Sequence, residues 1–109
     1  MDLGAFLRPG AQAAVLMAPA PEGEADQAVL GRLVRRGKRL SWLCAAEPPG
    51  RRLSLTLDLP GFSLDQEGDL CPAGPADTAA VVLLAEVRGC RPWGKEYALR
   101  LSLLGRVWP

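Results

Sequence analysis

The sequence predicts a small domain built mostly of antiparallel β-strands, and three observations support this. Its 109 residues are the usual size of one domain and too few for two ordinary ones. Ten prolines and twelve glycines fall in clusters, and the segments between them run to about 7–12 residues, the rhythm of a small barrel or sandwich. Within these segments apolar and polar residues alternate, as in half-buried strands. We therefore expect residues 1–109 to form a single β-domain.

The alternation is clearest in two segments, residues 52–59 and residues 97–103. Successive side chains of a strand point to opposite faces of the sheet, so every second residue of each segment faces the core. The leucines expected on that face are Leu53, Leu55, Leu57, Leu99, Leu101 and Leu103. Residues 81–87 are apolar on both faces, which fits either a central strand or a buried helix.

The segment from residue 24 to residue 37 has features of both a helix and a strand. Its acidic start, its basic end and Gly37 are typical of a helix, but Gly31 in the middle costs a helix about 1 kcal/mol relative to alanine. We favour a strand, because residues 35–39 then form a tight hairpin turn into a further strand, residues 39–44. One short helix is the alternative for this segment.

The composition argues against catalysis. The chain has no histidine, which removes the usual general base at neutral pH, the commonest metal ligand and every nucleophile pair built with histidine. It also lacks the Walker A, G-x-G-x-x-G and G-x-S-x-G motifs. The acidic residues from Asp58 to Asp69 do not have the spacing of a calcium loop, so we expect a solvated loop there. We predict no enzymatic activity, no catalytic residue, no metal site and no cofactor.

Charge and hydropathy bear on partners and location. The formal net charge of +1 favours neither a nucleic-acid nor a membrane partner. No apolar run approaches the roughly 18 residues of a membrane span. Residues 11–20 imitate a signal peptide, but their apolar core is short and Asp2 and Arg8 precede it, unlike a true leader. We expect a cytoplasmic protein without membrane insertion.

The charges are unevenly distributed along the chain. Residues 31–52 include seven basic residues, whereas residues 58–77 include five acidic residues and no basic one. Guanidinium groups bind phosphates and carboxylates through paired hydrogen bonds, so Arg35, Arg36 and Arg39 are candidate ligand-binding residues. Alternatively, these arginines pair with the acidic loop across the surface. Both interpretations stay open.

Three tryptophans occur in this short chain. Trp42 lies on the expected core face of its strand. Trp93 lies in an Arg-Pro-Trp-Gly-Lys turn, where it either stacks on a ligand or protein partner or folds over the end of the barrel. Trp108 is the penultimate residue and needs a docking groove or a partner. Trp93 and Trp108 are therefore the candidate partner-binding residues.

Residues from Pro48 onward resemble the PilZ domain family. Residues 49–60, Pro-Gly-Arg-Arg-Leu-Ser-Leu-Thr-Leu-Asp-Leu-Pro, are similar to the "pG-x-x-l-x-l-x-l-x-l-p" strand of PilZ domains. Residues 78–87, followed by residues 95–105, are similar to their closing pair of strands. The resemblance covers roughly 60 residues. It implies a small antiparallel six-stranded β-barrel in a cytoplasmic bacterial protein, which either binds cyclic di-GMP or acts as a protein adaptor in pilus and flagellar systems.

The motifs that bind cyclic di-GMP in this family are only partly present. Residues 35–39 match the spacing of R-x-x-x-R, but they lie in the expected hairpin and not before the barrel. The second motif, [DN]-x-S-x-x-G, is missing, because residues 63–66 have no glycine at the required place. The resemblance therefore implies a degenerate PilZ-like adaptor that contacts a protein partner. The alternatives are a cyclic di-GMP receptor that uses Arg35 and Arg39, and an OB-type binder of single-stranded nucleic acid.

The cysteines generate a first prediction. Cys44, Cys71 and Cys90 are an odd number with no C-x-x-C pair, which suits neither a disulfide framework nor a zinc site. We expect the reduced protein to be fully folded. Thermal melts recorded with and without reductant should coincide, and a large fall in melting temperature on reduction would contradict the prediction.

Overall fold

All the regular structure that can be described in this chain is β-strand. The computed structural model describes residues 10, 12–20, 28–67 and 69–106. Its strands are β1 (Gln12–Pro19), β2 (Val29–Arg36), β3 (Arg39–Cys44), β4 (Arg52–Pro60), β5 (Phe62–Leu64), β6 (Leu70–Pro72), β7 (Thr78–Trp93) and β8 (Glu96–Arg106). None of these described residues forms a helix that could span a membrane.

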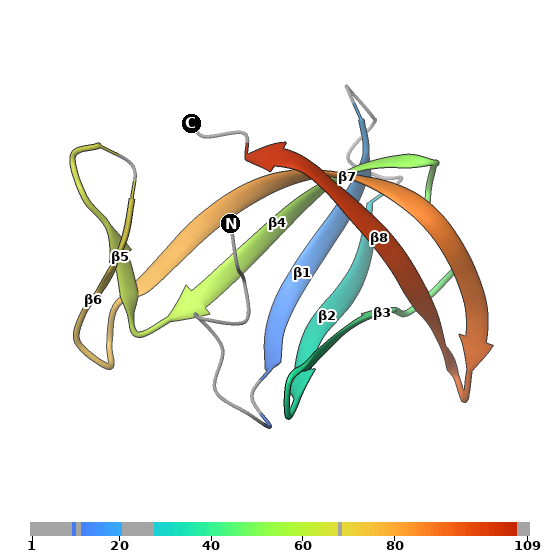
Figure 1. Cartoon of the computed structure of the whole chain (residues 1–109), viewed down its shortest axis with the longest axis horizontal. Coiled ribbons are helices and arrows are strands. Elements are labelled where there is room, and N and C mark those ends of the chain that lie inside the picture. The colour runs from blue at the N-terminus through green and yellow to red at the C-terminus, as the bar shows by residue number, and fades with distance from the viewer. Residues whose placement is uncertain (1–9, 11, 21–27, 68, 107–109) are drawn as a thin grey trace.

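Six strands close into an antiparallel barrel in the order β1-β2-β3-β8-β7-β4 (Figure 1). The other two, β5 and β6, form a hairpin that projects from one end of the barrel, on the left in Figure 1. The predicted small six-stranded antiparallel β-barrel is therefore confirmed. Residues 81–87 form part of β7, which pairs with β4 on one side and β8 on the other. Their apolar character on both faces thus belongs to a central strand.

The ambiguous segment is a strand where the structure describes it. Residues 29–36 form β2, which pairs with β1 and β3, while residues 24–27 lie outside the described residues. Gly37 has a φ of 62° in the turn between β2 and β3, a left-handed conformation that glycine adopts without steric cost. The expected hairpin over residues 35–39 is confirmed.

The core is lined by the inward side chains of all six barrel strands. Leu53, Leu55 and Leu57 of β4 have no exposed surface, and Leu99 of β8 is 7% exposed. Trp42 is 8% exposed and belongs to the same apolar cluster. These positions agree with the face that the alternation predicted.

Leu103 lies on the predicted core face, where it pairs with the buried Ala85, but it is 40% exposed and the core does not enclose it. It belongs to the same alternating series of β8 as Leu99 and Leu101, but the series loses burial along the strand: Leu101 is partly buried and Leu103 is exposed. Strand β3, which covers the other edge of β8 at Leu99, has separated from β8 by then. Alternation identifies the face of a sheet but not whether a neighbouring strand encloses it.

Gly31 marks a close approach of three strands. It pairs with Val15 of β1 and with Cys44 of β3. A Cβ atom added at Gly31 would lie 2.4 Å from the carbonyl oxygen of Leu43 and 2.8 Å from the side chain of Met17. Because the nearer atom belongs to the backbone, it cannot move without displacing β3.

We predict that Gly31→Ala destabilises the barrel by about 1–3 kcal/mol or more, since overpacking forces backbone shifts. Urea unfolding followed by circular dichroism measures the change. Gly105→Ala is the matched control, because a Cβ at Gly105 of β8 meets no atom within 4 Å. Equal stabilities of the two variants would show that the approach at Gly31 is not a constraint.

Candidate functional site

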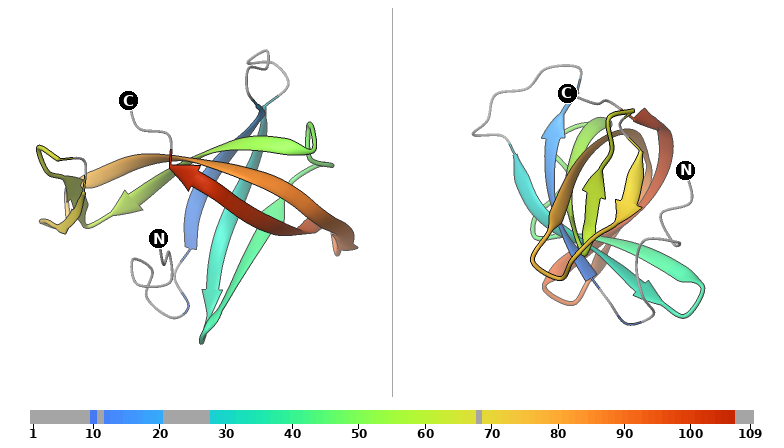
Figure 2. Two further views of the ribbon diagram at one scale, coloured as in Figure 1. Left: turned by 45° about the horizontal axis from the view of Figure 1, so that its top comes forward. Right: turned by 90° about the vertical axis from the view of Figure 1, so that its left-hand side faces the viewer.

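Two hairpins of the barrel diverge and leave a cleft between them. Strand β3 pairs with β8 only through Trp42↔Leu99, Leu43↔Ala98 and Cys44↔Tyr97. Beyond these pairs the β2–β3 hairpin and the β7–β8 hairpin point in different directions, as Figures 1 and 2 show from three sides. The open cleft has a volume of about 670 Å³, within the usual range of ligand-binding pockets.

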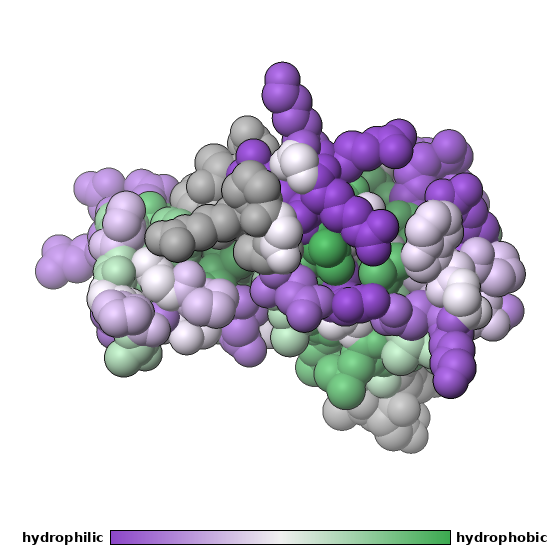
Figure 3. Space-filling model, turned by 90° about the horizontal axis from the view of Figure 1, so that it is seen from below, coloured by the Kyte–Doolittle hydropathy of each residue, from purple (hydrophilic) through white to green (hydrophobic). Residues whose placement is uncertain are grey.

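This cleft combines an apolar floor with arginines, and we call it the arginine cleft. It is lined by Arg39, Leu40, Ser41, Trp42, Gly89, Cys90, Arg91, Ala98, Leu99, Arg100 and Leu101. The lining includes three arginines and no acidic residue. From below the view of Figure 1, apolar surface is visible between strongly hydrophilic side chains (Figure 3). Such a surface suits a ligand that carries both negative charge and apolar groups.

A β-bulge orients the arginine and tryptophan at the end of β7. Val87 pairs with Leu101 and Gly89 pairs with Arg100, so Arg88 is an extra residue on β7. An extra residue reverses the alternation of the residues that follow it. After the bulge, Arg91 and Trp93 therefore lie on the outer face of the hairpin.

Arg91 and Trp93 form a cation–π pair at the edge of the arginine cleft. The guanidinium carbon of Arg91 lies 5.1 Å from the centre of the Trp93 ring, within the range of a favourable contact. Trp93 is 46% exposed, so nearly half of its surface is open to solvent. The pair presents a cation and an exposed aromatic surface together.

Arg100 is positioned by the strand beside it. Its side chain lies across Gly89, where a Cβ atom would be 3.7 Å from both its Nε and Nη2 atoms. The Nη2 atom also donates a hydrogen bond of 3.3 Å to the carbonyl oxygen of Arg88. A guanidinium has five donors, so this contact fixes Arg100 and leaves donors for a ligand.

An ion pair across the outside of the barrel ties the two hairpins together at the base of the cleft. Arg32 of β2 donates from Nη2 to Glu96 of β8 at 2.6 Å and from Nη1 to Gln12 of β1 at 3.1 Å. Strand β3 lies between β2 and β8, and its Leu43 pairs directly with Arg32. Leu43 is only 3% exposed although it faces outward, as expected if the ion pair covers it.

The three arginines predicted from the sequence do not share one face. Arg36 pairs with Arg39, whereas Arg35 pairs with Leu40, and cross-strand partners lie on the same side of a sheet. Arg36 and Arg39 therefore share one face, and Arg35 lies on the opposite one, with its Nε donating to the carbonyl oxygen of Gly37 at 2.8 Å. Of the three, only Arg39 lines the arginine cleft.

The other candidates are placed as follows. Trp93 lies at the end of β7 beside Arg91, and Trp108 lies outside the described residues. Sequence reasoning missed Arg91 and Arg100. The alternation of β8 does place Arg100 on its outer face, but the sequence has no signal for the divergence of β3 that brings it to a cleft.

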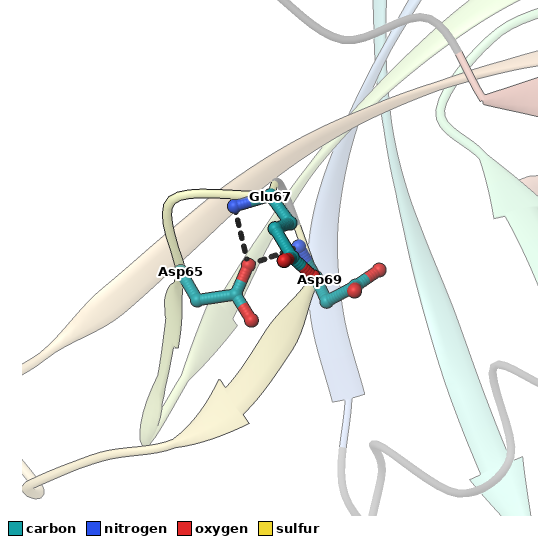
Figure 4. A group of neighbouring side chains, drawn as sticks. All are labelled: Asp65, Glu67 and Asp69. Atoms are coloured by element: carbon teal, nitrogen blue, oxygen red, sulfur yellow. Dashed lines mark hydrogen bonds between the residues drawn. The ribbon is translucent and has the colours of Figure 1, made fainter.

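Asp65, Glu67 and Asp69 lie in an exposed turn at the tip of the β5–β6 hairpin (Figure 4), whereas Asp58, which was expected in the same loop, lies in β4. The Oδ1 atom of Asp65 accepts hydrogen bonds from the backbone N–H groups of Glu67 at 2.9 Å and of Asp69 at 2.8 Å. The exposed carboxylates of these three residues lie within 4.8 Å of one another. Through these hydrogen bonds, the side chain of Asp65 stabilises the turn. This hairpin projects away from the tip of the β2–β3 hairpin (Figure 1).

The cysteines occupy three different environments, and all are free thiols. Cys44 is fully buried in the core, and this burial raises the pKa of its thiol. Desolvation and, next, the carboxylate of Asp65 raise the pKa of Cys71, whose Sγ donates to Asp65 Oδ2 at 3.6 Å. Cys90 is exposed and lines the arginine cleft.

Comparisons of the chain with protein-family models, with curated proteins and with solved structures find no match. The resemblance to PilZ domains therefore remains a prediction based on the residues quoted for it. The function has to be argued from the site itself.

The exposure of Trp93 predicts the response of its fluorescence to charged quenchers. In a Trp108→Phe background, iodide should quench more strongly than caesium, because the Arg91 guanidinium attracts anions to the exposed ring. The added change Trp93→Phe leaves only Trp42, which is 8% exposed and should be quenched little by either ion. Arg91→Gln should reduce the difference between the ions, and equal quenching by both before that change would contradict the predicted environment.

Proposed function

We propose that the chain is a non-catalytic adaptor module that works by protein–protein contact and binds acidic groups of its partner in the arginine cleft. The observation that carries this proposal is the cleft lining, in which Arg39, Arg91 and Arg100 flank an apolar floor without any carboxylate. Arginine is the cation best suited to bind carboxylates at interfaces. Trp93 adds an exposed aromatic residue, a type that is enriched at the centres of protein interfaces.

The proposal includes a PilZ-like role in a bacterial signalling, motility or pilus system. The resemblance of residues 49–60 and of the two closing strands supports this part, and the six-stranded barrel is the fold that the resemblance implies. A barrel of this kind hosts many functions, so the pathway depends on the resemblance alone.

Binding of cyclic di-GMP is the second candidate, and the hairpin geometry does not favour it. A clamp on one phosphate needs two guanidinium groups on the same side, whereas Arg35 and Arg39 lie on opposite faces of the β2–β3 hairpin. The third candidate, single-strand nucleic-acid binding, uses several exposed aromatic platforms in a basic groove. Trp93 is the exposed tryptophan among the described residues.

Amide NMR titrations test the proposal with hexaglutamate as the carboxylate probe. We expect saturable shifts at the amides of Arg39, Arg91 and Arg100. Arg100→Gln should weaken binding roughly ten- to a hundredfold, because a charge-assisted hydrogen bond contributes about 1.5–3 kcal/mol. Arg36→Gln is the control, since Arg36 pairs with Arg39 on the same outer face of the β2–β3 hairpin but does not line the cleft.

Parallel titrations with cyclic di-GMP and oligothymidine separate the alternatives. We expect no saturable binding of cyclic di-GMP at low micromolar concentration. A dissociation constant below about 10 μM that is lost in Arg35→Ala would replace the adaptor with a nucleotide receptor. Saturable binding of oligothymidine would favour the nucleic-acid reading, and hexaglutamate that leaves the cleft amides unshifted would refute the adaptor proposal.

A further inference from the structure

Strand β8 has a free edge along the arginine cleft. Its residues 97–99 pair with β3, but residues 100–106 have no β3 partner among the described residues. On their other side, residues 100–103 are held by β7. The backbone of this segment is therefore fixed in strand geometry on one side, while the groups on its other side have no strand partner among the residues that the structure describes. Such an edge is a template on which an extended peptide can add as a further strand.

The burial of the inner-face leucines of β8 decreases where β3 no longer covers them. Leu99 is 7% exposed, Leu101 is partly buried and Leu103 is 40% exposed, although all three point to the same face. The loss of burial follows the departure of β3 from this edge. A strand added beside β8, in the space that β3 leaves, would cover Leu101 and Leu103 in the way that β3 covers Leu99.

The two faces of this edge differ in chemistry. Leu101 and Leu103 lie on the inner face, and Arg100 lies on the outer face. Arg39 lies across the cleft from Arg100 and also faces outward, because it pairs with Arg36 and follows the alternation of Trp42. The side chains of an extended peptide also alternate between faces. A peptide in the cleft would therefore place every second side chain beside arginine and the others beside leucine.

We propose that the partner segment is an extended peptide in which acidic and apolar residues alternate, and that it adds as a strand to the free edge of β8 at residues 100–103. The acidic side chains bind Arg39 and Arg100, and the apolar side chains cover Leu101 and Leu103. This proposal rests on the proposed function, because it specifies the acidic segment that the arginine cleft binds. Charge complementarity selects this occupant, since the cleft has three arginines and no acidic residue.

Fluorescence anisotropy with three labelled hexapeptides tests the mode of binding. The first alternates valine and glutamate, the second has three valines followed by three glutamates, and the third is the first with N-methyl groups on alternate amides. We expect the alternating peptide to bind at least tenfold more tightly than the other two. The block peptide cannot place its side chains correctly, and N-methylation removes the donors that pair with a strand edge.

Two matched variants test the location. Leu103→Ser should weaken the alternating peptide about tenfold, since it removes one apolar contact, and should leave hexaglutamate binding unchanged. Leu104→Ser is the control, because Leu104 is 44% exposed but is the extra residue of a second bulge and lies outside the inner-face series. Circular dichroism checks that both variants are folded.

The possible outcomes distinguish the strand-addition proposal from the proposed binding of acidic groups in the arginine cleft. If the three peptides bind equally and Arg100→Gln weakens all of them, the arginine cleft binds acidic segments but strand addition is refuted. If neither hexaglutamate nor any of the three peptides binds, both proposals fail. If sedimentation shows that the protein alone dimerises and Leu103→Ser abolishes the dimer, the occupant of the edge is a second copy, which also overturns the proposal.

Discussion

The short ladder between β3 and β8 is the constraint on which the rest of the structure depends. Three residue pairs close the barrel there, whereas β4 and β7 share nine. A ladder this short encloses Trp42 and Leu99 in the core, but it leaves residues 39–41 of β3 and residues 100–103 of β8 unpaired with each other. The same three pairs therefore close the barrel and open the arginine cleft.

Other contacts reinforce this closure from both sides of the sheet. On the inside, the missing side chain of Gly31 lets β2 lie close to β3 near Leu43 and Cys44. On the outside, the Arg32–Glu96 ion pair connects β2 to β8 over the same strand. Both residues of the pair are partly exposed, and such a pair contributes only modest stability, about 1 kcal/mol or less. The pair connects β2 and β8 beside the three residue pairs at which β3 and β8 meet.

Much of this fold could be predicted from the sequence, and the limits have physical causes. Leu53, Leu55 and Leu57 of β4 are buried on the predicted face because β1 and β7 flank β4 on both sides at these residues. Leu103 obeys the same pattern, yet it is exposed because its neighbouring strand has departed. Periodicity reports the direction of a side chain, whereas burial depends on strands that are distant in sequence.

The site was less predictable for the same reason. The turn at residues 35–39 was correctly expected, but the alternation of a hairpin divides its arginines between two faces, and only Arg39 lines the cleft. Arg91 and Arg100 join it from the β7–β8 hairpin through strand pairing and a bulge. Neither feature has a local sequence signal comparable to a run of alternating leucines.

The bulge at Arg88 also determines which side chains of the following hairpin face inward and which face outward. Adding or removing one residue between Val87 and Arg91 exchanges the inner and outer sides of everything up to the turn, while a change of two residues preserves them. Changes in the length of this hairpin are thus tolerated in even steps and disruptive in odd ones. One unpaired residue in this way decides whether Arg91 and Trp93 lie on the outer or the inner face of the hairpin.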